Sequence, residues 1–220
     1  MSQLVLFDVD GTLLLTHDDV YVEANRLALT AVYGSAPDGS DVPGDTATAH
    51  TRRALAAAGF GGAEIDAGLR RWCETFSAHY VQLLATADTS GWETAPGARE
   101  SIARLDRRAL LTGNPPAVAH ARMERLGFAD LFPPGQGAFG CERDQRSELF
   151  ALARERAGDW PADRTVAVGD TPIDISSAHQ AGCRCVAVTT GAYERHQLAA
   201  ADVVIADLTQ LEEALDALAR

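Results

Sequence analysis

Three short segments of the chain place acidic or hydroxyl side chains directly after a run of apolar residues. They are Asp8-Val9-Asp10-Gly11-Thr12, Thr112-Gly113-Asn114, and Gly169-Asp170 followed by Asp174. If the segments meet in space, their carboxylates would repel one another unless a hard cation lay among them. Oxygen ligands alone favour magnesium over zinc. The segments therefore predict a Mg²⁺ site that a phosphate-bearing substrate would complete.

The elements that must position these residues alternate between strands and helices. Apolar segments predict strands at residues 4–7, 108–111, 165–168, 184–188 and 203–205. Helical periodicity follows at residues 115–126, 147–156, 172–181 and 208–218. This alternation predicts an α/β fold with a doubly wound, Rossmann-like parallel sheet. Ligands of such sheets bind beyond the carboxyl ends of the strands, so the three segments are expected to share one crevice.

The stretch at residues 16–92 interrupts the alternation. Helical periodicity runs through residues 20–33, 46–58 and 63–85, and the pattern contains no convincing strand. We expect a small all-helical domain at residues 16–92, inserted into an α/β core formed by residues 1–15 and 93–220.

The overall composition is that of an ordinary globular protein. Apolar residues make up 46% of the chain and charged residues 23%. The net charge of -12 repels phosphate backbones and anionic lipids, so we expect neither nucleic acid nor a membrane surface as a partner. No apolar run approaches the roughly 20 residues of a membrane span, and the N-terminal segment carries acids where a signal peptide carries bases. A cytoplasmic location is therefore expected.

Two residue types limit the available chemistry. All 19 basic residues are arginine, which excludes any mechanism that needs a lysine, including a Schiff base. The four cysteines are Cys73, Cys141, Cys183 and Cys185, and their spacing matches no common zinc or redox signature. We expect all four to be reduced and non-catalytic, with the last two as small apolar residues on a strand.

The three segments match, in order, motifs of the haloacid dehalogenase superfamily, which the chain resembles over nearly its whole length. Asp8 to Thr12 stands for the D-x-D-G-T motif, Thr112 for the strand-end hydroxyl, and Gly169 to Asp174 for G-D-x-x-x-D. The resemblance implies that Asp8 attacks phosphorus and that Asp10 protonates the leaving oxygen before activating water. It further implies that Asp8, Asp170 and the Asp10 carbonyl hold Mg²⁺, with Asp174 orienting the metal site.

The phosphate is expected to bind backbone groups near the first and second motifs. Gly11 lets the backbone approach, so amides near Val9, Asp10 and Gly113 can donate to phosphate oxygens. Thr112 and Asn114 belong to the same predicted set. For the Asn114 side chain, however, the favoured interpretation is an N-cap of the following helix. Asp174 has a similar alternative, as a charge in the first turn of a helix.

The family's third motif is a lysine, and this chain has none. Counting back from the fourth motif, and using the helix that follows, the best replacement is Arg146, with Arg143 as the alternative. Arginine keeps the positive charge but forks it, so its pairing with Asp8 and phosphate must differ from that of lysine.

The resemblance implies a magnesium-dependent phosphatase that acts on a small phosphorylated metabolite, with a layout similar to that of phosphoglycolate phosphatases. The helical insertion would be the cap that closes over the site, and the protein would be a monomer or a homodimer. A phosphomutase acting on a sugar phosphate stays open as the alternative. A dehalogenase fits less well because it uses neither Mg²⁺ nor an acid two residues after the nucleophile. A non-catalytic phosphate-binding protein would not need the nucleophile, acid and metal ligand together.

Overall fold

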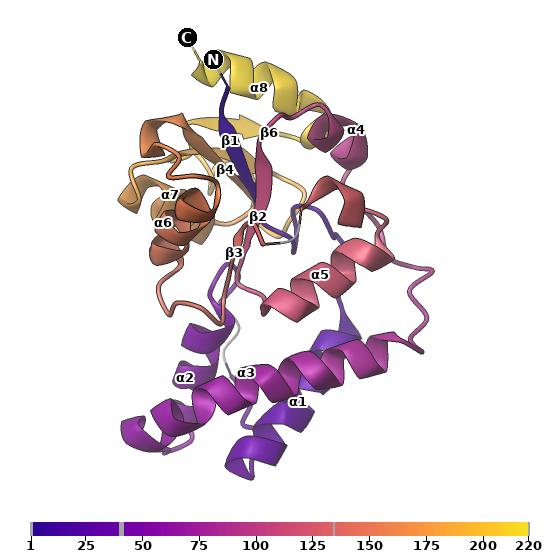
Figure 1. Ribbon diagram of the computed structural model, residues 1–220, viewed down its shortest axis with the longest axis vertical. Coiled ribbons are helices and arrows are strands. Elements are labelled where there is room, and N and C mark those ends of the chain that lie inside the picture. Colours follow the sequence, from indigo (N-terminus) through magenta and orange to yellow (C-terminus); the bar gives the residue numbers. More distant parts are fainter. Residues whose placement is uncertain (1, 40–41, 134, 220) are drawn as a thin grey trace.

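The computed structural model describes residues 2–39, 42–133 and 135–219 of the 220-residue chain. The expected core limits at residues 1 and 220, and residues 40–41 of the expected insertion, lie outside the described residues. Within the described ranges one parallel sheet has the strand order β3-β2-β1-β4-β5-β6 (Figure 1). Its strands are β1 (Leu4–Phe7), β2 (Arg108–Thr112), β3 (Ala138–Phe139), β4 (Thr165–Gly169), β5 (Arg184–Val188) and β6 (Val203–Ile205).

The strand order explains how distant motifs meet. β1 pairs with β2 on one side and with β4 on the other. The segments that follow these three strands therefore leave the same edge of the sheet side by side. The predicted doubly wound α/β sheet is confirmed, and β3 is the one strand of the described sheet that the sequence pattern missed. Its two residues are too few to show a periodicity.

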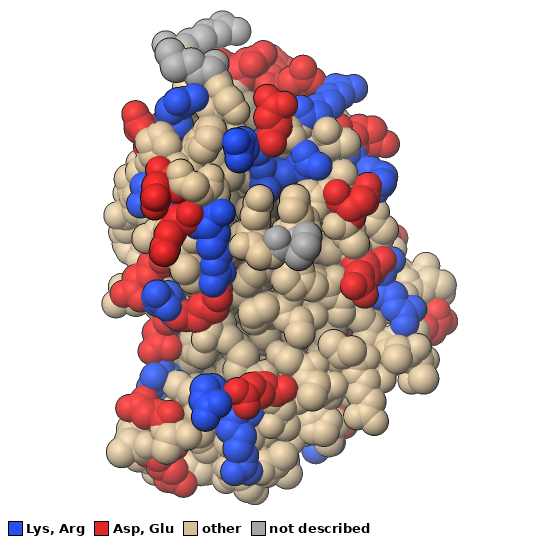
Figure 2. Space-filling model, in the orientation of Figure 1, with Lys and Arg blue, Asp and Glu red and all other residues tan. Residues whose placement is uncertain are grey.

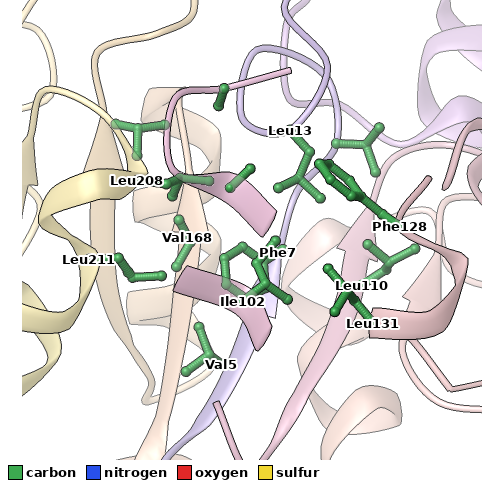
Figure 3. Packing of buried hydrophobic residues seen from close by; sticks show 14 of the residues in the cluster. Val5, Phe7, Leu13, Ile102, Leu110, Phe128, Leu131, Val168, Leu208 and Leu211 are labelled. Carbon is green, nitrogen blue, oxygen red and sulfur yellow. The ribbon is translucent and has the colours of Figure 1, made fainter. Parts of the chain in front are cut away.

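Helices cover both faces of the sheet because successive strand residues point to opposite sides. Val5 and Phe7 pack with Ile102 and Leu211 on one face (Figure 3), whereas Leu4 and Leu6 lie in the cluster on the other face. The first face is covered by α4 (Ala98–Ala103), α5 (Pro116–Arg125) and α8 (Leu211–Leu218). The second face is covered by α6 (Arg146–Arg156) and α7 (Pro172–Gln180).

The segment between β1 and β2 folds into three helices that lie beyond one end of the sheet (Figure 1). They are α1 (Asp19–Tyr33), α2 (Ala47–Ala57) and α3 (Gly62–Leu84). Their apolar faces share a separate core around Trp72 and Phe76, which also takes in Val118 of α5. The predicted helical insertion is confirmed, and we call it the cap. The cap is packed against the core through α5.

A disulfide joins the cap to the core. Cys73 of α3 is bonded to Cys141, with 6.3 Å between their Cα atoms. The expectation that all four cysteines are reduced is therefore wrong for this pair. The two residues are 68 positions apart, and only the docking of α3 beside the segment that follows β3 brings them together. Cys183 and Cys185 are free and buried, as expected, and burial raises the pKa of the Cys183 thiol to about 11.

The surface in Figure 2 intersperses arginines with acidic residues over both the core and the cap. Among the described helices, none is both long and apolar enough to cross a membrane.

Candidate active site

Asp8 lies at the carboxyl end of β1, directly after Phe7, where its backbone amide donates to the carbonyl of Val168 on β4. Its side chain is buried. The chain then turns sharply, and the carbonyl of Val9, which is also buried, accepts the amides of Leu13 and Leu14. This turn keeps Asp8 and Asp10 at the edge of the sheet.

The turn brings the backbone at Gly11 against Asp170. Gly11 has a φ of 72°, in the left-handed region that glycine adopts most easily, and a β-carbon there would lie 2.3 Å from Oδ2 of Asp170. The neighbouring Thr12 hydroxyl donates to Oδ1 of Asp170 at 3.2 Å. The first and fourth motifs are therefore in direct contact.

Three buried carboxylates gather at this edge. Asp8, Asp170 and Asp174 each place an oxygen within 4.8 Å of the others. Burial raises the pKa of Asp8 to about 6, with Arg146 opposing the rise and Asp174 and Asp10 adding to it. Burial also raises the pKa of Asp170 to about 8, helped by the charges of Asp8 and Asp174. Such crowding is unfavourable for three anions and suits a hard divalent cation with oxygen ligands.

Asp174 has two roles in its local structure. It lies in the first turn of α7 and forms a capping box with Thr171: the Thr171 hydroxyl accepts the Asp174 amide at 3.1 Å, and the Asp174 carboxylate accepts the Thr171 amide at 3.0 Å. Its other oxygen, Oδ1, accepts from Arg146 at 2.5 Å. The first-turn position and the place in the acidic cluster, which the sequence left as alternatives, occur together.

Arg146 is the arginine that reaches the acidic cluster. It is the first residue of α6 and is buried, and its Nη2 lies 3.1 Å from Oδ1 of Asp8. Burial acts to lower the pKa of its guanidinium, but Asp174 and Asp8 raise it by more. Arg143, in contrast, is exposed, and its Nη1 donates to the carbonyl of Glu142. Of the two arginines proposed for the third motif, Arg146 has the position beside Asp8.

The side chain of Asn114 binds Thr112 and Asp10 rather than a helix terminus. Thr112 ends β2, and its hydroxyl accepts from Nδ2 of Asn114 at 2.9 Å. The same Nδ2 group donates to Oδ2 of Asp10 at 2.7 Å. The favoured N-cap interpretation of Asn114 is therefore wrong. Helix α5 begins one residue later than expected, at Pro116, and Pro115 takes the N-cap position without a side-chain hydrogen bond.

The cap segment at residues 44–47, which leads into the first turn of α2, packs over the site. The carbonyl of Gly113 accepts the amide of Ala47 at 2.8 Å, which places the predicted phosphate-binding backbone directly under the cap. Thr46 donates to the carbonyl of Asp144 at 2.7 Å, and the carbonyl of Gly44 accepts from Nη1 of Arg146 at 2.9 Å. This segment therefore contacts both Gly113 of the second motif and the residues from Asp144 to Arg146.

A cavity lined by described residues lies away from the acidic cluster. It measures about 640 Å³ and lies between α3 and the segment before α6, with both Cys73 and Cys141 in its lining. Asp8 and Asp170 do not line it. We therefore place the chemistry at the acidic cluster, where the charged groups converge.

Two residues at the site were missed from the sequence. Arg122 binds both oxygens of Asp10, and a β-carbon on Gly191 would lie 1.8 Å from Oδ2 of Asp170. Each had a detectable signal. Arg122 interrupts the apolar face that Val118 and Met123 form on α5, and Gly191 lies just past the carboxyl end of β5.

The fold and this cluster define the class of protein. The sequence profile of the haloacid dehalogenase-like hydrolases matches residues 3–182, and the chain belongs to that family. A phosphoglycolate phosphatase of Mesorhizobium japonicum is 30% identical over 209 residues, which cover 88% of this chain and 85% of that protein. A second phosphoglycolate phosphatase, from Rhodospirillum rubrum, is 28% identical over 90% of this chain and 84% of its own length. Both of these relatives are phosphoglycolate phosphatases.

Solved structures share the fold. The crystal structure of CbbY from Rhodobacter sphaeroides in complex with phosphate superposes with a TM-score of 0.69 at 22% identity, covering 98% of this chain and 100% of that one. A β-phosphoglucomutase from Clostridium difficile superposes with a TM-score of 0.66 at 17% identity, covering the whole of both chains. At these identities the likeness establishes the architecture and leaves the reaction to the site.

Proposed function

We propose that this protein is a magnesium-dependent phosphatase that hydrolyses a small phosphorylated metabolite through a phosphoaspartate on Asp8. One observation carries the proposal: the Asp8 carboxylate lies at a strand end, beside the Arg146 guanidinium and with an oxygen within 4.8 Å of oxygens of Asp170 and Asp174. A carboxylate nucleophile needs positive charge beside it to approach a phosphate dianion. The surrounding groups can supply and hold that charge.

The donor set fits Mg²⁺. Asp8 and Asp170 would bind it through side-chain oxygens, the carbonyl of Asp10 would add a third oxygen ligand, and Asp174 would orient the site. All are hard oxygen donors, and a divalent cation among the buried carboxylates would relieve the repulsion that raises the pKa of Asp170, which supports the proposal. When bound, Mg²⁺ would offset the negative charge of the phosphate and of the attacking carboxylate.

The chain's own residues divide the reaction into two displacements. Asp8 attacks phosphorus while Asp10 gives a proton to the leaving oxygen, which releases the alcohol and leaves a phosphoaspartate. Water then attacks the phosphoaspartate, Asp10 takes its proton, and inorganic phosphate and free Asp8 result. Arg146 opposes the negative charge in both steps, and backbone amides near Val9 and Gly113, with Thr112 and Asn114, would hold the phosphate oxygens.

The substrate is expected to be small because the cap packs directly on the second-motif backbone, where the Ala47 amide donates to the Gly113 carbonyl. Phosphoglycolate is the first candidate, since relatives with 28% and 30% identity that cover most of this chain are phosphoglycolate phosphatases. Phosphoglycolate has a short carbon chain with two anionic groups, which is compatible with a site that the cap covers and that contains arginine.

The test begins with phosphate release from phosphoglycolate and from a panel of phosphorylated metabolites, with and without Mg²⁺. The Asp8→Asn variant is almost isosteric but cannot attack phosphorus, so it should lose turnover, and mass spectrometry of acid-quenched parent enzyme should find the added phosphoryl group on Asp8. Turnover by Asp8→Asn within about tenfold of the parent would contradict the nucleophile assignment. Product analysis with a sugar monophosphate separates hydrolysis from transfer back to the sugar.

A further inference from the structure

Arg122, in the last turn of α5, is only 1% exposed although it carries a full positive charge. A charge is stable in such a position only when it is paired and hydrogen-bonded. Arg122 meets two carboxylates that belong to different parts of the protein. Its Nη1 faces Asp10 of the core motif, and its Nη2 and Nε face Asp18, at the point where the cap begins.

The cap holds one edge of this guanidinium. Oδ2 of Asp18 lies 2.8 Å from Nη2 and 3.0 Å from Nε, and Asp18 is itself the N-cap of α1. Tyr80 of α3 donates its hydroxyl to the same Oδ2 at 2.7 Å and accepts from Nε of Arg122 at 3.2 Å. The Tyr21 and Tyr80 rings lie 5.0 and 5.7 Å from the guanidinium carbon. Helices α1 and α3 therefore fix its orientation jointly.

The opposite edge of the guanidinium holds Asp10. Nη1 donates to both carboxylate oxygens at 2.9 Å, and the Asp10 side chain is otherwise half exposed. The guanidinium is planar and rigid, so a displacement of the edge held by Asp18 and Tyr80 also displaces the edge that binds Asp10. The position of the Asp10 carboxyl is thereby linked to the position of the cap helices.

We infer that Arg122 is a positioning residue that sets the orientation of Asp10 according to the docking of the cap through Asp18 and Tyr80. The inference rests on the proposed function, in which Asp10 delivers a proton to the leaving oxygen. Arg122 itself would touch neither substrate nor metal. Its effect is that Asp10 is aimed for proton delivery when the cap is docked, which ties the chemical step to the closed arrangement.

The alternative is that Arg122 has only a structural role and anchors the cap to α5. A second arginine of the same helix provides the matched control for this alternative. Arg125 lies three residues later on α5 and donates through Nη2 to the carbonyl of Leu84, at the end of the cap helix α3. Among the hydrogen bonds and ion pairs of the described residues, none joins Arg125 to Asp10. Arg122→Lys and Arg125→Lys both keep the positive charge and both disturb a contact between the core and the cap. Only Arg122→Lys is expected to change the orientation of the Asp10 carboxyl group.

The experiment compares two substrates that differ in their need for an acid. The leaving group of phosphoglycolate is an alkoxide, which must be protonated as it departs. The leaving group of p-nitrophenyl phosphate is a stabilised phenolate, which needs no proton. For Arg122→Lys we expect kcat/KM to fall by about 10²-fold with phosphoglycolate and by no more than about threefold with p-nitrophenyl phosphate, because a misplaced acid matters only to the first. Arg125→Lys should change both values equally.

A second variant covers the case in which Arg122→Lys folds poorly. Tyr80→Phe keeps the ring and removes one hydroxyl that joins Asp18 to Arg122, so it should show the same substrate-selective loss on a smaller scale. Equal losses on both substrates for the Arg122 and Tyr80 variants would overturn the inference while leaving the phosphatase proposal intact. A parent enzyme without turnover of either substrate would overturn both.

Discussion

Nη2 of Arg146 lies 3.1 Å from Oδ1 of Asp8 and 2.5 Å from Oδ1 of Asp174. A single guanidinium group thus contacts the proposed nucleophile and the capping box of α7 together. In a chain without lysine, we propose that Arg146, the first residue of α6, supplies the positive charge of the family's third motif. The forked guanidinium can hold two carboxylates at fixed angles, whereas an ammonium group would act as a point charge.

Replacement of Arg146 should therefore be costly. Arg146→Ala is expected to lower kcat/KM by about 10²-fold or more, because it removes a preorganised charge beside the developing negative charge of the transition state. Arg143→Ala is the matched control: Arg143 is exposed, and its side chain donates to the carbonyl of Glu142. Steady-state kinetics of the two variants decide the assignment. A larger loss in Arg143→Ala would show that the third motif has been placed on the wrong arginine.

A methyl group at position 191 should disable the acidic cluster. The β-carbon of Gly191→Ala would lie 1.8 Å from Oδ2 of Asp170, so the carboxylate or the loop after β5 must move. We expect a loss of about 10²-fold in kcat/KM, together with a higher Mg²⁺ concentration for half-maximal activity. Gly62→Ala is the control, since a β-carbon there meets no atom within 4 Å. Unchanged magnesium dependence in Gly191→Ala would contradict the assignment of Asp170 as a metal ligand.

The metal-free protein should lose stability as the pH rises. The pKa values of Asp8 and Asp170 are raised from 3.8 to about 6 and about 8, so the folded protein keeps protons that the unfolded chain has already released. Below pH 3.8 both states are protonated and the effect is absent. Between there and about pH 8 the folded state binds more protons, and the free energy of unfolding falls as the pH increases.

Thermal unfolding with excess chelator measures this slope. Added Mg²⁺ competes with the protons, so the rise in Tm that it causes should grow with pH over the same window. Asp170→Asn, which cannot ionise, should flatten the slope of the metal-free protein. A metal-free slope that is the same in Asp170→Asn and in the parent would show that Asp170 does not titrate in this range.

The bond between Cys73 and Cys141 should stabilise the docked cap. Because it closes a loop of 68 positions, its loss is expected to lower the free energy of unfolding by about 2–4 kcal/mol. Urea unfolding of the parent with and without a dithiol reductant measures the difference. The Cys73→Ser variant should match the reduced parent and should not respond to the reductant. If the parent is equally stable in both conditions, the cross-link does not contribute to stability.

The sequence by itself determined the frame of the site. Apolar runs that end in Asp8, Thr112 and Asp170 predict strands that are followed by candidate catalytic residues. The alternation of these strands with helices predicts a parallel sheet. Parallel strands present their carboxyl ends at one edge, so these side chains were bound to meet once β2, β1 and β4 became neighbours. These features depend on local periodicity, which a single sequence contains.

The tertiary structure decided two kinds of feature. One depends on the exact residue at which a helix begins, and the other on contacts between residues far apart in the sequence. Asn114 was misjudged because two adjacent prolines allow either start for α5, and the later start turns its amide to Asp10. The sequence favoured Arg146 over Arg143 by spacing alone, and the docking of α6 on the sheet places Arg146 beside Asp8 and leaves Arg143 exposed. Arg122 finds its carboxylate partners 104 and 112 positions away, and Cys73 finds Cys141 at 68. Such pairings leave no local pattern because their energy arises only when the cap and the core pack together.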